Sequence, residues 1–317
     1  MKKPLIYSIL LLLPSLVVST SCSTSSSENI SLSGAFALYP LAVKWGEEYR
    51  KLHPDTRIDI SGGGAGKGMA DALAGAVDLG MFSREISPAE KEKGVWWITV
   101  AKDAVLPTIS ASNPFLGNLQ QKGLSSTQFR QIFITKEIST WGQALSSANA
   151  DKINLYTRSD AAGAAATWAQ FLQWDAKQEN LQGIGVFGDP GLAEAVSKDP
   201  LAIGFNNVAY VYNINTGEKR PGIEVIPIDV NENGRIDPEE DFYDHAGSLL
   251  KAIAGGKYPS PPARELYFVS DGLPENKAVL AFLKWILTDG QQYVKEAGYV
   301  PVDTAILQSE LQKLNGK

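Results

Sequence analysis

Three short segments of this sequence are crowded with residues that carry little or no side chain. They are residues 34–38 (Gly-Ala-Phe-Ala-Leu), 62–68 (Gly-Gly-Gly-Ala-Gly-Lys-Gly) and 160–165 (Asp-Ala-Ala-Gly-Ala-Ala). Each lies where an expected strand leads into an expected helix. The first amides of a helix have no partner inside it and carry the positive end of the helix dipole, so bare backbone there can bind an anion. The segments predict a socket for a small oxyanion if they converge, although glycine and alanine could also serve only tight packing.

Two arginines stand beside these segments. Arg158 precedes the third segment by two residues, and Arg84 follows an expected strand at residues 77–81. Each could donate hydrogen bonds to an anion, or could form an exposed ion pair of little energetic value, with Asp160 and Glu85 respectively. A nucleotide is not expected, because Gly68 stands where a phosphate-binding loop needs Ser or Thr for magnesium.

A second constellation lies at residues 229–240 and has the spacing of a calcium-binding loop. Gly234 takes the sixth position, where such loops turn sharply, and Ile236 takes the apolar eighth position. Calcium needs six to eight oxygen ligands, which this spacing wraps around one point. The predicted metal-binding residues are Asp229, Asn231, Asn233, Arg235, Asp237 and Glu240. The alternative is a metal-free turn rich in Asn and Gly. A structural Ca²⁺ is therefore the only cofactor expected.

Composition limits the classes of function. The chain has 317 residues, 44% apolar composition and a net charge of −6, which argue for a folded protein of two domains and against nucleic-acid binding. Its two histidines, His53 and His245, have no recognisable nucleophile or metal-binding partner in the sequence, so we do not expect an enzyme. A hydrolase of phosphorylated substrates would need a base that the sequence does not reveal.

The first residues have the features of an export signal. Lys2 and Lys3 precede an apolar run at residues 5–18, which is shorter than the roughly 20 residues that span a bilayer. Cys22, the only cysteine, follows small residues and resembles a bacterial lipoprotein cleavage site. We therefore expect a signal peptide at residues 1–21 and a lipidated tether at residues 22–28. Ordinary signal cleavage nearby is the alternative.

The remaining chain alternates short β-rich runs with helical periods, which predicts an α/β protein with mostly parallel strands. Strands expected at residues 97–100 and 105–109 flank Lys102-Asp103 and suit a segment that crosses between lobes, and further strands are expected at residues 203–205 and 209–212. A strand at residues 266–269 would return the chain to the first lobe, and two crossings make a hinge. The predicted domains are lobe 1, residues 29–104 and 264–317, and lobe 2, residues 105–263.

The order of several fragments resembles the phosphate-binding components of ABC uptake transporters. These fragments are Leu-Tyr-Pro-Leu at residues 38–41 with Trp45, Ser-Gly-Gly-Gly at residues 61–64, Val-Asp-Leu-Gly at residues 77–80, Ser83-Arg84, and Arg-Ser-Asp at residues 158–160. The resemblance spans nearly the whole mature chain. It implies a type II periplasmic-binding fold, in which two α/β lobes joined by a two-strand hinge close over phosphate. It also implies an extracytoplasmic location, a membrane permease as partner and a monomer.

The resemblance also implies the ligand-binding residues. Four positions that carry hydroxyl groups in the family hold alanine here, and Ser83 stands where many members have an acid that accepts a proton from hydrogen phosphate. Two outcomes fit: phosphate held by backbone amides and arginine, or a site retuned for sulfate, molybdate or tungstate. A calcium-stabilised lipoprotein with a structural or sensory role and no ligand is a third. The implied set is Ala37, Leu38, Ala65, Gly66, Ser83, Arg84, Arg158, Ala162, Gly163 and Ala164.

Overall fold

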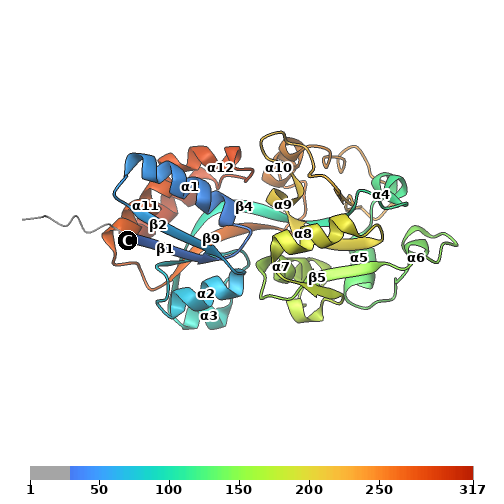
Figure 1. The fold of residues 1–317 in the computed structure, drawn as a ribbon, viewed down its shortest axis with the longest axis horizontal. Helices are drawn as coiled ribbons and strands as arrows, with labels where there is room; N and C mark the ends of the chain where they lie inside the picture. The colour runs from blue at the N-terminus through green and yellow to red at the C-terminus, as the bar shows by residue number, and fades with distance from the viewer. Residues whose placement is uncertain (1–28, 317) are drawn as a thin grey trace, which may run out of the picture.

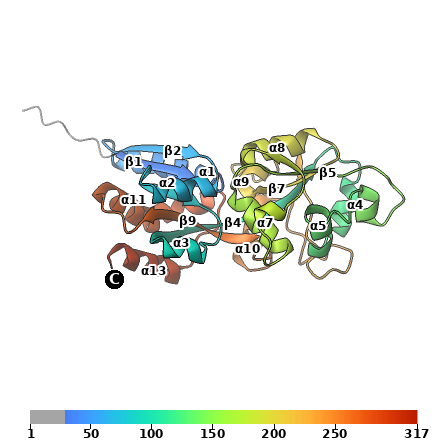
Figure 2. The ribbon, with the colours of Figure 1, turned by 90° about the horizontal axis from the view of Figure 1, so that it is seen from below.

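Two α/β lobes lie side by side in the computed structural model, which describes residues 29–316 (Figures 1 and 2). Two long strands, β4 (Val95–Ser110) and β9 (Ala263–Asp271), run between the lobes. The expected signal peptide, the tether and Cys22 lie outside the described residues.

The first lobe is built on strands β1 (Asn29–Gly34), β2 (Arg57–Gly62) and β3 (Leu79–Phe82). Strand β1 pairs in parallel with β2 and β3, and β3 pairs antiparallel with β9, which lies against the first half of β4. The helical segments of this lobe are α1 (Tyr39–Leu52), α2 (Ala65–Leu73), α3 (Pro88–Glu92), α11 (Lys277–Leu287), η2 (Asp289–Gln291), α12 (Gln292–Glu296) and α13 (Thr304–Leu314).

The second lobe uses the other half of β4. That half pairs antiparallel with β7 (Ala202–Asn207) and β8 (Ile223–Val225). Strand β7 is parallel to β5 (Asn154–Arg158), which is parallel to β6 (Ile184–Val186). The helical segments are α4 (Leu116–Lys122), α5 (Ser126–Phe133), α6 (Trp141–Leu145), α7 (Gly163–Leu172), η1 (Gln178–Asn180), α8 (Gly188–Lys198), α9 (Val208–Val211) and α10 (Ala246–Ala254).

Two hydrophobic cores lie at the two ends of the crossing strands, and each includes residues of those strands. One is formed by buried residues between Ile30 and Ala101 and between Leu266 and Tyr299, joined by Ala209. The other is formed by buried residues between Ala104 and Ala263, joined by Val300. Because each lobe buries most of its own apolar surface, the lobes can rotate about the crossing strands while most of each core stays packed.

The crossing differs from the sequence prediction in one respect. Strand β4 continues through Lys102-Asp103 without a break, and Asp103 lies opposite Arg264 of β9 in register. The strand predicted at residues 209–212 is also wrong, because residues 208–211 form helix α9 immediately after β7. That run is short and buried, and periodicity cannot separate a strand from a helix in a short apolar run.

Candidate functional site

The structure brings the three small-residue segments together between the lobes. They surround a small, tightly closed space between the lobes. Parallel strands β1 and β5 both end at this level, as expected for α/β sheets that bind ligands beyond the carboxyl ends of their strands. The residues that line the space, here called the interlobe cavity, are Ala35, Phe36, Ala37, Gly64, Ala65, Ser83, Arg158, Ala162, Gly163, Ala164, Asp189 and Asn207.

The helices that start at this cavity lack side-chain caps. Helices α3, α5 and α6 begin with a Ser or Thr whose hydroxyl accepts from the first turn. Helices α1, α2 and α7 begin after Leu38, Gly64 and Ala162, none of which supplies such a bond. Helix starts normally satisfy their free amides with side chains, water or ligand. The sequence therefore leaves the starts of α2 and α7 open toward the cavity, whereas the first amides of α1 are bonded within their own loop.

Backbone amides are available there as donors. Among the described residues, no acceptor partners the amides of Ala37, Ala65, Gly163 and Ala164, although all four residues are buried or line the cavity. A buried amide without a partner costs free energy comparable to a lost hydrogen bond. Four in one cavity indicate a place for a ligand rich in acceptor oxygens.

Two of the predicted ligand-binding residues have backbone amides that already donate hydrogen bonds within the protein. Leu38 donates to the carbonyl of Ala35 at 3.1 Å within its own loop. Gly66 donates across the lobes to the carbonyl of Ala161 at 2.9 Å. Leu38 and Gly66 therefore shape and close the cavity in this structure but do not line it.

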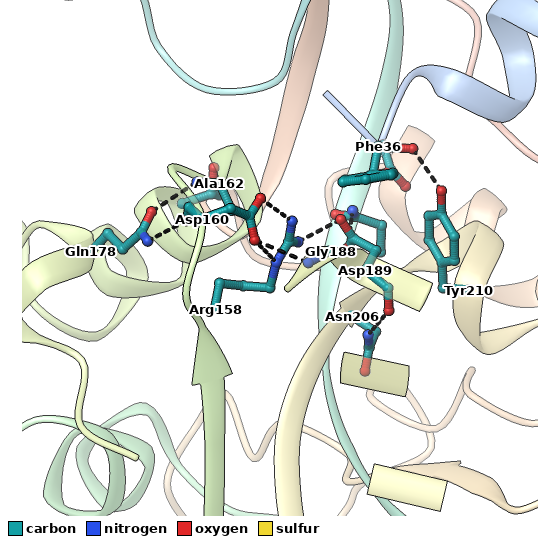
Figure 3. Close-up of polar contacts among 12 residues, drawn as sticks. Phe36, Arg158, Asp160, Ala162, Gln178, Gly188, Asp189, Asn206 and Tyr210 are labelled. Atoms are coloured by element: carbon teal, nitrogen blue, oxygen red, sulfur yellow. Dashed lines mark hydrogen bonds and ion pairs between the residues drawn. The ribbon is translucent and has the colours of Figure 1, made fainter. Parts of the chain in front are cut away.

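Arg158 is the cation of the cavity (Figure 3). Its Nε and Nη2 donate to the two oxygens of Asp160 at 2.8 and 2.6 Å, and its Nη1 donates to Oδ2 of Asp189 at 2.5 Å. Burial by itself would lower the pKa of Arg158, but the charges of Asp189 and Asp160 raise it above its ordinary value. The ion pair with Asp160 that the sequence suggested is therefore present, but it is buried at the cavity wall and not exposed.

Asp189 and Asn207 were missed by the sequence analysis. Asp189 lies in the first turn of α8 and is only 2% exposed, and Asn207 Nδ2 donates to its Oδ1 at 2.5 Å. The pattern Gly-Asp-Pro at residues 188–190 is a helix start with an acid in the first turn, which could have marked this junction. Nothing in the sequence showed that it would meet Arg158.

The lobes are closed over the cavity. The hydroxyl of Tyr210 in the second lobe donates to the carbonyl of Phe36 in the first at 3.0 Å (Figure 3). The ring of Phe36 meets the ring of Phe187 edge to face with centroids 6.1 Å apart. With the Gly66–Ala161 bond, these contacts join the two lobes around the cavity.

Arg84 lies beside the cavity but not in it. Its Nη2 and Nη1 bind the carboxylate of Glu90 at 2.7 and 3.0 Å, and Nη1 also donates to the carbonyl of Glu85. The guanidinium covers the ring of Phe82. Arg84 instead lines a wider groove between α3 and α7 that the cavity adjoins at Ala162. Ser83, its neighbour, does line the cavity.

The acidic loop folds around its own carboxylates. Asp229 accepts from the amides of Asn233 and Gly234 at 3.2 and 2.8 Å, and Glu240 accepts from the amides of Val230, Asn231 and Asp237. Asp229 and Glu240 are buried. In the part of the chain that the structure describes, no three His, Cys, Asp or Glu side chains gather as a metal site. The loop's predicted oxygens include amides and one carbonyl, so the calcium prediction stays open.

Comparison with known proteins shows to which superfamily the chain belongs. The profile of a family described as "PBP superfamily domain" matches residues 19–290. The chain belongs to this superfamily. It is 26% identical over 287 residues to the phosphate-binding protein PstS of Staphylococcus epidermidis strain RP62A, covering 89% of this chain and 81% of the relative. It is 25% identical to PstS of Xylella fastidiosa, covering 89% and 84%.

Solved structures of the superfamily share the fold. A phosphate ABC transporter substrate-binding protein from Clostridium perfringens, solved with phosphate and called putative in its name, superposes with a TM-score of 0.70 at 21% identity and covers 87% of this chain and 100% of its own. A phosphate transport receptor from Vibrio cholerae gives 0.61 at 18% identity, covering 86% and 100%. These likenesses confirm the predicted type II periplasmic-binding fold. None of the helices described is long and apolar enough to cross a bilayer.

Proposed function

We propose that this protein is an extracytoplasmic substrate-binding lipoprotein that captures phosphate between its lobes for uptake by an ABC transporter. One observation carries the proposal: four backbone amides that have no acceptor among residues 29–316 line the same small cavity as Arg158. The donors belong to three junctions drawn from both lobes, so a bound anion would hold the lobes together. The proposed ligand is therefore also the agent of closure.

Phosphate suits this cavity because its oxygens can accept from several directions at once. A hydrogen bond to a charged group is worth about 1.5–3 kcal/mol. The family's hydroxyls are absent at the four alanine positions, Ala37, Ala65, Ala162 and Ala164, so the four backbone donors and Arg158 would hold the anion. The net charge of −6 does not oppose this, because charges farther away than about 8 Å are screened by salt.

The relatives support the transport role. Those of S. epidermidis and X. fastidiosa are named phosphate-binding proteins, and the structural neighbours from C. perfringens and V. cholerae carry names of phosphate transport. The rest of the proposal follows: a permease as membrane partner, a lipid on Cys22 as anchor, a monomer in solution and no catalysis. Within the described residues neither histidine lines the cavity.

The acidic loop adds a structural role. We propose that residues 229–240 bind one Ca²⁺ through Asp229, Asn231, Asn233, the carbonyl of Arg235, Asp237 and Glu240. In the structure the side-chain amides of Asn231 and Asn233 both donate to Asp237 Oδ2, at 2.9 and 2.7 Å. These contacts gather several of the proposed ligands on one side of the loop. To bind the ion, each amide would flip so that its oxygen, which now accepts from a loop amide, takes the place of its nitrogen.

Isothermal titration calorimetry of the purified protein with phosphate, sulfate, molybdate and tungstate tests the proposal. Phosphate should bind with a stoichiometry of one, with or without calcium. Tight binding of another oxyanion in place of phosphate would show that the site has been retuned. The four alanines at positions where the family has hydroxyl groups are the reason to test this alternative. Binding of none would leave a structural or sensory lipoprotein. Release of phosphate from a model ester would contradict the binding role.

A further inference from the structure

We infer that the end of lobe 1 farthest from lobe 2 rests on the lipid bilayer, at the level of the headgroups, when the protein is anchored. This surface, here called the outer end, is separate from the interlobe cavity. The inference rests on the proposed function, since it takes the lipid on Cys22 as the anchor. It adds which face of the folded protein meets the membrane and which side chains make the contact.

The outer end is formed by the connecting segments that lie opposite the cavity in lobe 1. Helices α1 and α2 start at the cavity and end away from it, at Leu52 and Leu73. The start of β1 pairs in register with the start of β2, and the start of β4 pairs with the end of β9. Figures 1 and 2 show the C-terminus at this end as well. The connecting segments of the outer end are residues 53–56, 74–78, 93–94 and 272–276.

The described chain begins at the outer end. Asn29 opens β1 beside Arg57 of β2, and Cys22 lies seven residues earlier in the sequence. Seven residues span at most about 25 Å. Neighbouring strands lie about 4.8 Å apart, so the five strands of this lobe, from β2 to β4, cover about 19 Å. A lipid on Cys22 therefore holds Asn29 within about 25 Å of the bilayer, where every connecting segment of the outer end can reach the headgroups.

Apolar and aromatic side chains are exposed at this end. Leu52 is 63% exposed and Leu273 is 40% exposed. Trp96 and Trp97, both half-buried, line a groove between the start of β4 and the segment that follows β9. Among the described residues neither indole N–H has an acceptor. A tryptophan with an apolar ring and a free N–H suits the boundary between membrane and water, where one end is apolar and the other wet.

The charges at the outer end indicate that apolar contact, and not lipid charge, carries the binding. The ammonium groups of Lys91 and Lys313 lie 5.7 and 5.4 Å from the centre of the Trp97 ring. Lysines placed in this way cover apolar surface with their stems and keep their charges in water. The four connecting segments and the residue on either side of each carry two more acids than cations, and Lys91 and Lys313 offset that difference. The outer end therefore lacks the basic cluster that recognises anionic lipid.

A weak contact is enough because the anchor supplies the proximity. A short tether keeps its two ends at an effective concentration of about 1 mM or more. A surface with an affinity for lipid near this value is then bound for about half of the time or more, whereas the same protein without its lipid stays in solution. With the outer end on the bilayer, lobe 2 points away from it and is free to rotate about β4 and β9 (Figure 1).

The test uses Cys22, the only cysteine, to couple the protein that begins at this residue to a maleimide lipid in phosphatidylcholine vesicles. Lipids with a nitroxide on the headgroup then quench tryptophans that lie at the interface. Four of the seven tryptophans are buried, so quenching reports on Trp96, Trp97 and Trp174. We expect quenching that falls at least twofold when Trp96→Phe and Trp97→Phe are combined. Trp174→Phe, which changes the exposed tryptophan of lobe 2, is the matched control and should leave the quenching unchanged.

Combining Leu52→Ser with Leu273→Ser tests the apolar contact while keeping every tryptophan. Quenching should fall at least twofold, whereas Ile184→Ser, which removes an exposed apolar side chain of lobe 2, should not alter it. High salt, or phosphatidylglycerol in the vesicles, should change the quenching by less than about twofold, because the charges balance.

Three results would overturn the inference: no quenching, quenching that depends on Trp174, or a dimer of the uncoupled protein in ultracentrifugation that the two leucine changes abolish. Each would leave the proposed function intact, because the variants change no residue of the cavity and should bind phosphate as the original protein does. An original protein that binds no phosphate, or that carries no lipid on Cys22 when isolated from cell membranes, would overturn the proposed function itself.

Discussion

Arg158 and Asp160, two residues apart in the chain, form a two-pronged ion pair in which both carboxylate oxygens are held by one guanidinium, at 2.8 and 2.6 Å. The pair is buried, with 1% and 6% of the two side chains exposed. It fixes the arginine at the cavity wall, so the guanidinium beside residues 160–165 is already oriented before a ligand binds. Preorganised donors bind an anion without the cost of ordering a flexible side chain.

Removing this arginine should damage both binding and stability. Arg158→Ala leaves Asp160 and Asp189 buried without their cation, which typically costs about 3–5 kcal/mol. We expect that loss in the free energy of urea unfolding without ligand, and a fall of more than tenfold in phosphate affinity. Arg57→Ala, which breaks the exposed pair with Asp59, is the control and should change stability by less than about 1 kcal/mol. Unchanged stability in Arg158→Ala would contradict the buried pair.

Gly163 should be needed for the lobes to close. A Cβ there would lie 2.2 Å from Ser83 Oγ and 2.5 Å from the Ser83 carbonyl oxygen in the other lobe. Alanine suits the first turn of a helix, so Gly163→Ala should leave each lobe stable but hold the lobes apart. Phosphate affinity should fall at least tenfold.

The control for this change is Gly117→Ala, at the start of α4, where a Cβ would meet nothing. Small-angle scattering with saturating phosphate should show a larger radius of gyration for Gly163→Ala than for the control. Identical affinity and identical scattering in the two variants would mean that the closed arrangement is not the ligand-bound one.

Asp103 at the crossing should make stability depend on pH. Among the described residues no side chain donates to its carboxylate, only the backbone of Ala104 and Val208 lies close enough to interact weakly, and the nearest cation, Arg264 Nη2, is 3.8 Å away. Burial, only partly offset by Arg264, raises the pKa of Asp103 to about 7 from its ordinary 3.8. The folded protein therefore keeps a proton that the unfolded chain releases between about pH 4 and about pH 7.

Because the folded state binds more protons in that window, stability should fall as the pH rises through it, by at most about 1.4 kcal/mol per pH unit from this group. Asp103→Asn should remove this contribution. The difference in unfolding free energy between the variant and the original protein should grow in favour of the variant from about pH 4 to about pH 7. A constant difference would show that Asp103 is ionised throughout.

The acidic loop should respond to calcium through Glu240. Calcium should raise the Tm of the original protein, and Glu240→Gln should abolish that rise because the twelfth position supplies two ligand oxygens. Glu239→Gln, which changes the exposed neighbouring acid, should keep the rise. If Glu240→Gln lowers the Tm equally in calcium and in chelator, the loop is held only by its hydrogen bonds to Val230, Asn231 and Asp237.

The local features of this structure could be predicted from the sequence. Small residues at a strand-to-helix junction are a local signal, and the starts of α2 and α7 were predictable from residues 62–68 and 160–165. The short buried run of α9 was not, because burial on all sides removes the periodicity that separates helix from strand.

The cavity itself depends on contacts that no local pattern encodes. Asp189 meets Arg158 across 31 positions and Asn207 across 18. Arg264 reaches Asn207 only because β9 returns beside β4. Arg84 is the converse case, since its position after β3 predicted a ligand, while Glu90 on the next helix holds its guanidinium.

The central claim is that unpartnered amides of both lobes hold the anion, and amide NMR tests it most directly. In a ¹⁵N-labelled protein titrated with phosphate, the amide resonances of Ala37, Ala65, Gly163 and Ala164 should shift together and saturate at one equivalent, while that of Leu38, already bonded to Ala35, should move least among the residues beside the cavity. Saturable shifts confined to other parts of the molecule, or none at all, would contradict the account.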